Sequence, residues 1–228
     1  MSVYKRQKFK EQIDVIDSSC NDLPQMSVIL YSGSLLFKLV QYCSLIPNPL
    51  QITHCGVIIH ISGYELLKLL NANKFKNLSQ RFRDVVRKNI FYSDQIVRPY
   101  IIEARSPCVV IAPVDITVNG YPGNIYLRKP LVQYDQILFE WTDLIGLPYK
   151  MNVQMLLAGW SLNSKEDSTA LFCSELVALL MKRARLLNVN SSNIIPKELG
   201  SAGQKADILR NICQKEIQLK LYVNETSK

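Results

Sequence analysis

The sequence predicts an α+β domain in which an antiparallel sheet packs with helices, and two observations predict it. Short β-branched runs bounded by turn residues follow one another directly, as hairpin-linked strands do, at residues 27–32, 53–61, 100–105, 108–114 and 124–128. The clearest helix comes later in the chain. From Cys173 onward, apolar residues recur at helical spacing and the last turn is basic, as the negative end of a helix dipole prefers.

Helical periodicity also marks four other stretches, at residues 34–45, 63–91 with a break near 71–77, 134–145 and 152–160. Glycine and proline at positions 120–123 mark a turn before the strand at 124–128. No internal repeat or proline- and glycine-rich linker divides the chain. We therefore expect one domain over residues 23–200, with residues 1–22 and 201–228 as extensions at its periphery.

The composition and the distribution of apolar residues predict the cellular compartment. With 228 residues and 48% apolar content, the chain is long enough to bury a core. No apolar run approaches the roughly eighteen residues that a membrane span needs, and the first residues lack the apolar middle of a secretory signal. We expect a cytoplasmic protein, either in the cell that makes it or in a host cell that receives it.

The net charge of +8 is concentrated between Lys68 and Lys88, where the only acidic residue is Asp84. Such a run is usually a solvated helical face, but it also suits docking on an anionic membrane surface or an acidic protein partner. Nucleic acid is the weaker expectation, because no glycine-rich phosphate loop, aromatic stacking pattern or nucleic-acid module accompanies the charge.

The cysteines and histidines restrict the chemistry. The six cysteines are widely spaced without a CxxC pair, which argues against a disulfide framework and a zinc site. With only two histidines, His54 and His60, a histidine-based metal site is also unexpected. Nothing indicates a cofactor, and the oligomeric state is not indicated either.

Cys173 is the candidate nucleophile. It stands in the first turn of its helix, where backbone N–H groups lack an intrahelical acceptor. Those groups and the helix dipole favour a thiolate over a thiol, and they could also hold the oxyanion of an acyl-transfer intermediate. The alternative is ordinary burial, because free cysteine is among the most buried residue types.

His54 is the candidate base. Strand alternation places His54 and Gly56 on one face and Cys55 on the other. The glycine leaves room for a substrate or a neighbouring backbone to approach, so Gly56 is a candidate substrate-binding position. His60 lies about 20 Å further along the strand, at 3.3 Å per residue, and is expected to be a surface or capping histidine.

Glu103 is the candidate third member, because it interrupts an apolar strand and a buried carboxylate needs a partner. If its strand pairs with that of His54, the carboxylate can receive the imidazole N–H and fix its tautomer. A simple ion pair with Arg105 explains the same residue equally well. Glu175 is the weaker candidate, since the dipole alone explains an acid in a first helical turn.

Six segments, in chain order, resemble the circularly permuted, NlpC-type papain-like hydrolases, particularly the YiiX-like branch and its poxvirus relatives. They are PQMSVILYSGS at 24–34, THCGVII at 53–59, YIIEARSPCVVIAPV at 100–114, LIGLPYK at 144–150, LFCSELV at 171–177 and IIPKEL at 194–199. The resemblance implies a permuted papain-like fold with Cys173 as nucleophile, His54 as base and Glu103 as its orienter. It also implies that Tyr149, in a Gly-x-x-Tyr element, lines the site.

Two segments depart from that family: a long insertion at 62–99, and a spacer at 147–171 that is longer than in compact members. FCSEL also differs from the NCEHF-like sequence of the lecithin-retinol acyltransferase branch. The expected activity is a thiol hydrolase that cleaves an amide or acyl bond of a peptide, a protein conjugate such as a ubiquitin-like one, or an acylated lipid. The alternative is a catalytically silent module that docks through its basic insertion.

Overall fold

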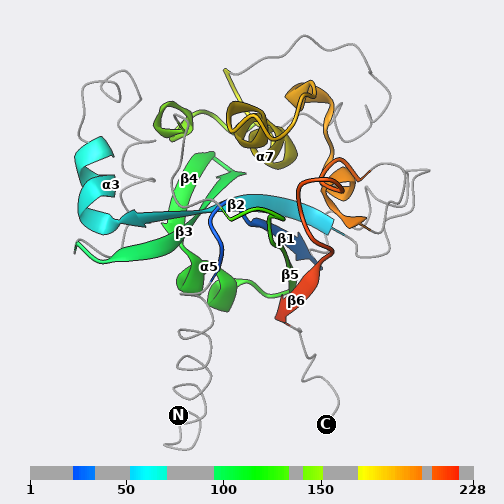
Figure 1. Ribbon diagram of the computed structural model, residues 1–228. Helices are drawn as coiled ribbons and strands as arrows, with labels where there is room; N and C mark the ends of the chain where they lie inside the picture. Colours follow the sequence, from blue (N-terminus) through cyan, green and yellow to red (C-terminus); the bar gives the residue numbers. More distant parts are fainter. Residues whose placement is uncertain are drawn as a thin grey trace, which may run out of the picture.

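The computed structural model describes residues 23–33, 52–70, 95–133, 141–150, 169–201 and 207–220. Within them the fold is α+β, with six antiparallel strands in the order β4-β3-β2-β1-β5-β6 (Figure 1). The strands are β1 (Val28–Ser32), β2 (Ile52–Ser62), β3 (Val97–Arg105), β4 (Cys108–Pro113), β5 (Asn124–Arg128) and β6 (Ile217–Lys220). The antiparallel sheet and its first five strands are confirmed, and β3 begins three residues earlier than predicted.

Helices cover both faces of the sheet (Figure 1). The helix α7 (Cys173–Arg183) packs on the face that carries Cys55, Val57 and Ile102, and its apolar stripe is fully buried there. Each such Leu, Val or Met side chain contributes about 1.5–3 kcal/mol on burial. The short helix α5 (Val114–Gly120) packs on the opposite face, against a second apolar cluster that includes Tyr31.

Helix α5 corrects the prediction, which extended the preceding strand to residue 114. Its sequence, VDITVNG, is rich in β-branched residues, which favour strands when nothing else decides. Burial of Val114 and Val118 on one side of a helical turn overrides that preference. Thr117 Oγ1 donates to the carbonyl oxygen of Pro113 at 3.0 Å, four residues back, as helical threonines do.

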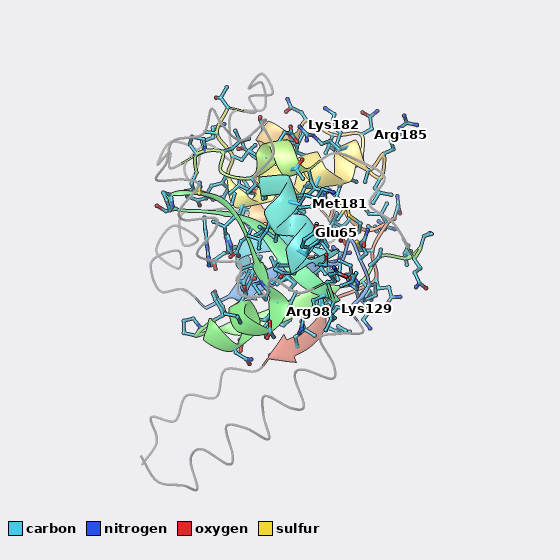
Figure 2. The ribbon with its side chains drawn as sticks, turned by 90° about the vertical axis from the view of Figure 1, so that its left-hand side faces the viewer. Glu65, Arg98, Lys129, Met181, Lys182 and Arg185 are labelled. Carbon is cyan, nitrogen blue, oxygen red and sulfur yellow. The ribbon has the colours of Figure 1, made fainter. Side chains whose placement is uncertain are left out.

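The chain leaves β2 through a capping box. The Ser62 hydroxyl accepts the backbone N–H of Glu65 at 3.1 Å, and the Glu65 carboxylate accepts the backbone N–H of Ser62 at 3.3 Å. This starts α3 (Gly63–Leu70), at the end of the sheet that Figure 2 views, with Glu65 and Arg98 labelled. Because Ser62 also pairs with Val97, the predicted insertion connects two neighbouring antiparallel strands.

The chain beyond residue 200 contributes to the core, which corrects its expected peripheral position. Strand β6 extends the sheet beside β5, and Leu209 and Cys213 are buried in the main apolar cluster. The buried Arg128 of β5 forms a bidentate pair with Asp207, at 2.5 and 3.0 Å. The guanidinium also donates to the carbonyl oxygen of Leu199, so β5 and the C-terminal segment are held together.

Several predicted helices lie outside the described residues. These are the helices at 34–45 and 152–160, the part of 63–91 after residue 70, and most of 134–145, whose end is a single 3-10 turn at Thr142–Leu144. The N-terminal extension at 1–22 lies outside them too. In the part of the chain that the structure describes, no helix has the length and apolar character to cross a membrane.

Candidate active site

Cys173 is the first residue of α7, as predicted, and its side chain is fully buried. The start of the helix is fixed by Glu175, whose Oε2 accepts the backbone N–H of Phe172 at 2.9 Å. The other carboxylate oxygen of Glu175 lies 3.2 Å from Nζ of Lys150. Glu175 is therefore a helix cap with its own counterion.

His54 and Glu103 meet because their strands are antiparallel neighbours: His54 stands near the start of β2 and Glu103 near the end of β3. Nε2 of His54 lies 2.9 Å from Oε2 of Glu103. The carboxylate is almost fully buried, whereas 21% of the imidazole side chain is exposed. This pair matches the predicted base and orienter.

Arg105 interacts with the same carboxylate. Its Nη1 lies 3.1 Å from Oε1 of Glu103, and 42% of its side chain is exposed. The two explanations that the sequence left open for Glu103 thus hold together, one on each oxygen. Burial raises the pKa of Glu103, but the hydrogen bond and positive charge of His54, the charge of Arg105 and the hydroxyl of Tyr31 outweigh it and lower the pKa.

Gly56 allows β2 and β3 to lie close together. A Cβ at this position would stand 2.7 Å from Cγ2 of Ile101, 2.9 Å from the carbonyl oxygen of Ile102 and 3.3 Å from Cβ of Glu103. The space beside the glycine is therefore filled by β3. Of the two expected roles, the structure shows the close approach of a neighbouring backbone, and the contact of Gly56 with a substrate stays a prediction.

The thiol of Cys173 interacts with the ring of His54. Because Nε2 is engaged by Glu103, Nδ1 is the ring nitrogen left for the sulfur. Burial lowers the pKa of His54, but its hydrogen bond and charge interaction with Cys173, followed by those with Glu103, raise it to about 10. At neutral pH the imidazole is therefore protonated.

The pKa of the nucleophile, Cys173, is shifted in the opposite direction. Burial raises the pKa of Cys173, but hydrogen bonds from the side chains of Cys55 and His54, the charge of His54 and the backbone N–H of Cys55 lower it to about 5. Cys173 and His54 thus form a thiolate–imidazolium pair between about pH 5 and 10. The three predicted side chains converge in one place.

Cys55 is a site residue that the sequence analysis did not select. It lies on the face of β2 that α7 covers, in the same buried apolar cluster as Cys173. Burial and the neighbouring Cys173 and Glu103 raise the pKa of Cys55 well above its usual value, so it remains a thiol. A cysteine on the helix-facing side of the histidine strand was the signal that could have identified it.

Tyr31 is the second residue that sequence reasoning missed. It is the cross-strand neighbour of His54 in the β1–β2 pair, and the two ring centroids are 5.2 Å apart. On its other side the Tyr121 ring packs at 4.8 Å. Burial, and then the charge of Glu103, raise the pKa of Tyr31, so its hydroxyl stays protonated beside the carboxylate. Only the strand register, which the sequence does not show, reveals this contact.

Tyr149 reaches the site from the LPYK segment. Its backbone N–H donates to the carbonyl oxygen of Pro107 at 3.0 Å, and it forms a β-bridge with Leu171, two residues before the nucleophile. Its ring lies 5.7 Å from that of Phe172. Burial, and then the charges of Cys173 and Cys55, raise the pKa of Tyr149. Its role in lining the site stays a prediction.

His60 is not part of the site. It lies on β2, six residues after His54. Its Nε2 is 2.7 Å from the carbonyl oxygen of Leu23. Within the described residues, no group of three His, Cys, Asp or Glu side chains is arranged to hold a metal ion. The four described cysteines, Cys55, Cys108, Cys173 and Cys213, are all free thiols.

Comparisons of the chain with protein-family models and with curated proteins found no match. The function therefore has to be argued from the geometry and charges of this site.

Proposed function

We propose that the protein is a cysteine-dependent hydrolase of amide or acyl bonds, with Cys173 as nucleophile, His54 as general acid and base, and Glu103 as orienter of the imidazole. The observation that carries the proposal is the buried chain from carboxylate to imidazole to sulfur, with the 2.9 Å contact between His54 and Glu103. A structural cysteine needs no such partners. An activated thiolate next to an oriented imidazolium is the arrangement that acyl transfer through a thiol requires.

The reaction follows from the charge state. The Cys173 thiolate attacks the carbonyl carbon of the substrate, and the carbonyl oxygen becomes an oxyanion held by N–H groups of the first turn of α7. His54 then gives its proton to the leaving amine or alkoxide, and an acyl-enzyme remains. Water, or another nucleophile, loses a proton to His54 and attacks the thioester, which releases the acyl product and restores the thiolate.

Access to the sulfur is part of the proposal, because Cys173 is fully buried in this structure. The imidazole is partly exposed, as are Tyr149 and Phe172 next to the nucleophile. A substrate carbonyl reaches the thiolate once the side chains over it move. Tyr149 is positioned to line the path, and its ring offers an apolar surface with one polar end to a bound acyl group.

We further propose that the fold is the permuted papain-like one and that the protein works in the cytoplasm. The support for the first is the chain order, since the histidine and acid strands both precede the nucleophile helix. The support for the second is the free state of the four described cysteines, which suits a reducing compartment.

The proposal is tested with three substrate classes: a peptide amide, an isopeptide-linked ubiquitin-like conjugate and an acylated lipid. Cys173→Ala is expected to abolish turnover of the substrate that is cleaved, and intact-mass spectra of the parent protein should show the acyl adduct on Cys173. Cys213→Ala, which removes a buried thiol far along the chain, is the matched control and should retain activity. Turnover that persists in Cys173→Ala would overturn the proposal.

A second candidate function is docking on an anionic membrane surface or an acidic partner through the basic segment. The observation in its favour is that Tyr64, Ile96 and Val97, where that segment joins α3 and β3, are 52–60% exposed. This end of β2 is eight residues from His54, or about 26 Å at 3.3 Å per residue, so docking and catalysis would use separate surfaces.

Vesicles with and without anionic lipid test this second function. Binding should survive Cys173→Ser and disappear when Arg81, Arg83, Arg87 and Lys88 are neutralised together. Neutralising Lys182 and Arg185, which lie on and just after α7 (Figure 2), serves as the control for loss of positive charge elsewhere in the chain. Binding that is retained without the four basic residues would remove this function.

A further inference from the structure

The contact between two thiols has no role in the reaction derived above. Cys55 reaches Cys173 from β2, the strand on which α7 packs, and both its side chain and its backbone N–H form hydrogen bonds with the sulfur of Cys173. Both side chains are fully buried and neither is in a disulfide. The nucleophile therefore has a second thiol in direct contact, held by the packing of a strand and a helix.

The two sulfurs differ in their chemistry. Cys173 is a thiolate at neutral pH, because its pKa is about 5, and the thiolate is the form that peroxides oxidise. Burial raises the pKa of Cys55, so Cys55 keeps its proton. Cys108 and Cys213 are also buried, which raises the pKa of each to about 11. Of the four described cysteines, Cys173 alone is set up to be oxidised first.

We propose that Cys55 and Cys173 form a reversible redox-modification site, in which a hydroperoxide oxidises Cys173 and Cys55 then closes a disulfide with it. In the first step the thiolate attacks the peroxide oxygen, the O–O bond breaks, and Cys173 becomes a sulfenic acid. The hydroxide or alkoxide that departs takes the proton of the His54 imidazolium and leaves as water or an alcohol. In the second step the sulfur of Cys55 attacks the sulfenic sulfur, and its proton leaves with the hydroxyl as water. The thiol pair loses two electrons and the peroxide gains them.

The arrangement favours this second step over further oxidation. A sulfenic acid without a neighbouring thiol proceeds to sulfinic acid, which ordinary reductants do not reverse. Here the resolving thiol already interacts with the sulfur of the nucleophile, so the disulfide, about 2 Å long, forms between side chains that are already neighbours. A dithiol reductant restores both thiols by exchange. The formation of the disulfide does not depend on the proposed function. Only its consequence rests on that function, because the disulfide removes the nucleophile and so inactivates the hydrolase.

Peptide mapping tests the site without any substrate. The fully reduced protein is treated at neutral pH with hydrogen peroxide in small excess, free thiols are blocked in denaturant, and the digest is analysed without reductant. The expected result is a cross-linked peptide that joins Cys55 to Cys173, and its disappearance after dithiothreitol. Cys108→Ser should behave as the parent protein, because that thiol does not contact the nucleophile.

Cys55→Ser and Cys55→Ala provide the second arm, and the far-ultraviolet circular dichroism of each confirms that at least one is folded. In the folded variant, peroxide should convert Cys173 to the sulfinic form, which dithiothreitol does not reverse. A parent protein in which Cys173 stays reduced, becomes sulfinic or pairs with another cysteine would overturn the inference. If the disulfide forms but no substrate class is cleaved, the redox site stands and the proposed hydrolase fails, so the two failures are distinguishable.

Discussion

Nε2 of His54 donates to Oε2 of Glu103 at 2.9 Å, and this one hydrogen bond decides which ring nitrogen faces the nucleophile. It joins the start of β2 to the end of β3, which are neighbouring antiparallel strands. The two residues are 49 positions apart in the sequence. Because Nε2 is engaged by Glu103, Nδ1 is the ring nitrogen left for Cys173. The charge of Glu103 also stabilises the imidazolium that the thiolate requires.

Replacing Glu103 by Gln removes the negative charge while keeping the size of the side chain. Without that charge the imidazolium is less stable, so the pKa of His54 should fall and that of Cys173 should rise. We expect kcat/KM at neutral pH to drop by about 10²–10⁴-fold, the usual contribution of positioned acid–base groups. Arg105→Gln, which removes the charge on the other carboxylate oxygen, is the control and should have a much smaller effect.

Replacing Tyr31 by Phe removes only the hydroxyl beside Glu103. That hydroxyl lowers the pKa of Glu103, so its loss raises the pKa and the carboxylate becomes protonated at a higher pH. Because the carboxylate loses one of the groups that hold it beside the imidazole, kcat/KM should fall by about 3- to 30-fold. Tyr121→Phe is matched to it, because the Tyr121 hydroxyl interacts with Thr53, and should change kcat/KM much less.

Replacing Gly56 by Ala should disrupt the β2–β3 pair. The new methyl group would meet the carbonyl oxygen of Ile102 at 2.9 Å, and backbone cannot yield as a flexible side chain does. We expect a loss of about 1–3 kcal/mol in the free energy of unfolding, together with a weaker contact between His54 and Glu103. Gly120→Ala, where a Cβ would meet nothing within 4 Å, should be neutral or slightly stabilising in the same urea titrations.

Replacing Arg128 by Met should leave Asp207 as a buried, unpaired carboxylate. Both side chains are at most 5% exposed, and breaking such a pair costs about 3–5 kcal/mol in the free energy of unfolding. Arg183→Gln breaks the exposed pair with Asp143 and should cost about 0–1 kcal/mol. Equal effects of the two variants in chemical denaturation would contradict the structural role assigned to the chain beyond residue 200.

The sequence predicted the elements whose local pattern and burial agree. The apolar stripe after Cys173 has helical spacing and is buried as a helix, and the β-branched run around His54 is a buried strand. Glu103 was identifiable because a carboxylate inside an apolar strand needs a partner. In these three cases the local sequence was enough to predict the structural role of the residues.

The remaining site residues depend on register and on which helix covers which face. Tyr31 is an ordinary strand residue until the β1–β2 register places it opposite His54, and Cys55 is an ordinary buried cysteine until α7 packs over it. Helix α5 and strand β6 were missed for two other reasons. Tertiary burial overrides the β-branched sequence of the helix, and the four-residue edge strand carries too few residues for a recognisable alternation.

The ionisation of Cys173 tests the central claim most directly, because the hydrogen bond and charge of His54 help to lower the pKa of this thiol. The ultraviolet absorbance of the thiolate, measured across a pH titration as the difference between the parent protein and Cys173→Ala, reports that ionisation even though the sulfur is buried. The thiolate is the stabilised form, so the signal should be present at neutral pH and be lost as the pH falls through about 5. His54→Ala should move this midpoint upward and slow the reaction of Cys173 with a haloacetamide. A midpoint at or above the usual value near 8.5, unchanged by His54→Ala, would contradict the account.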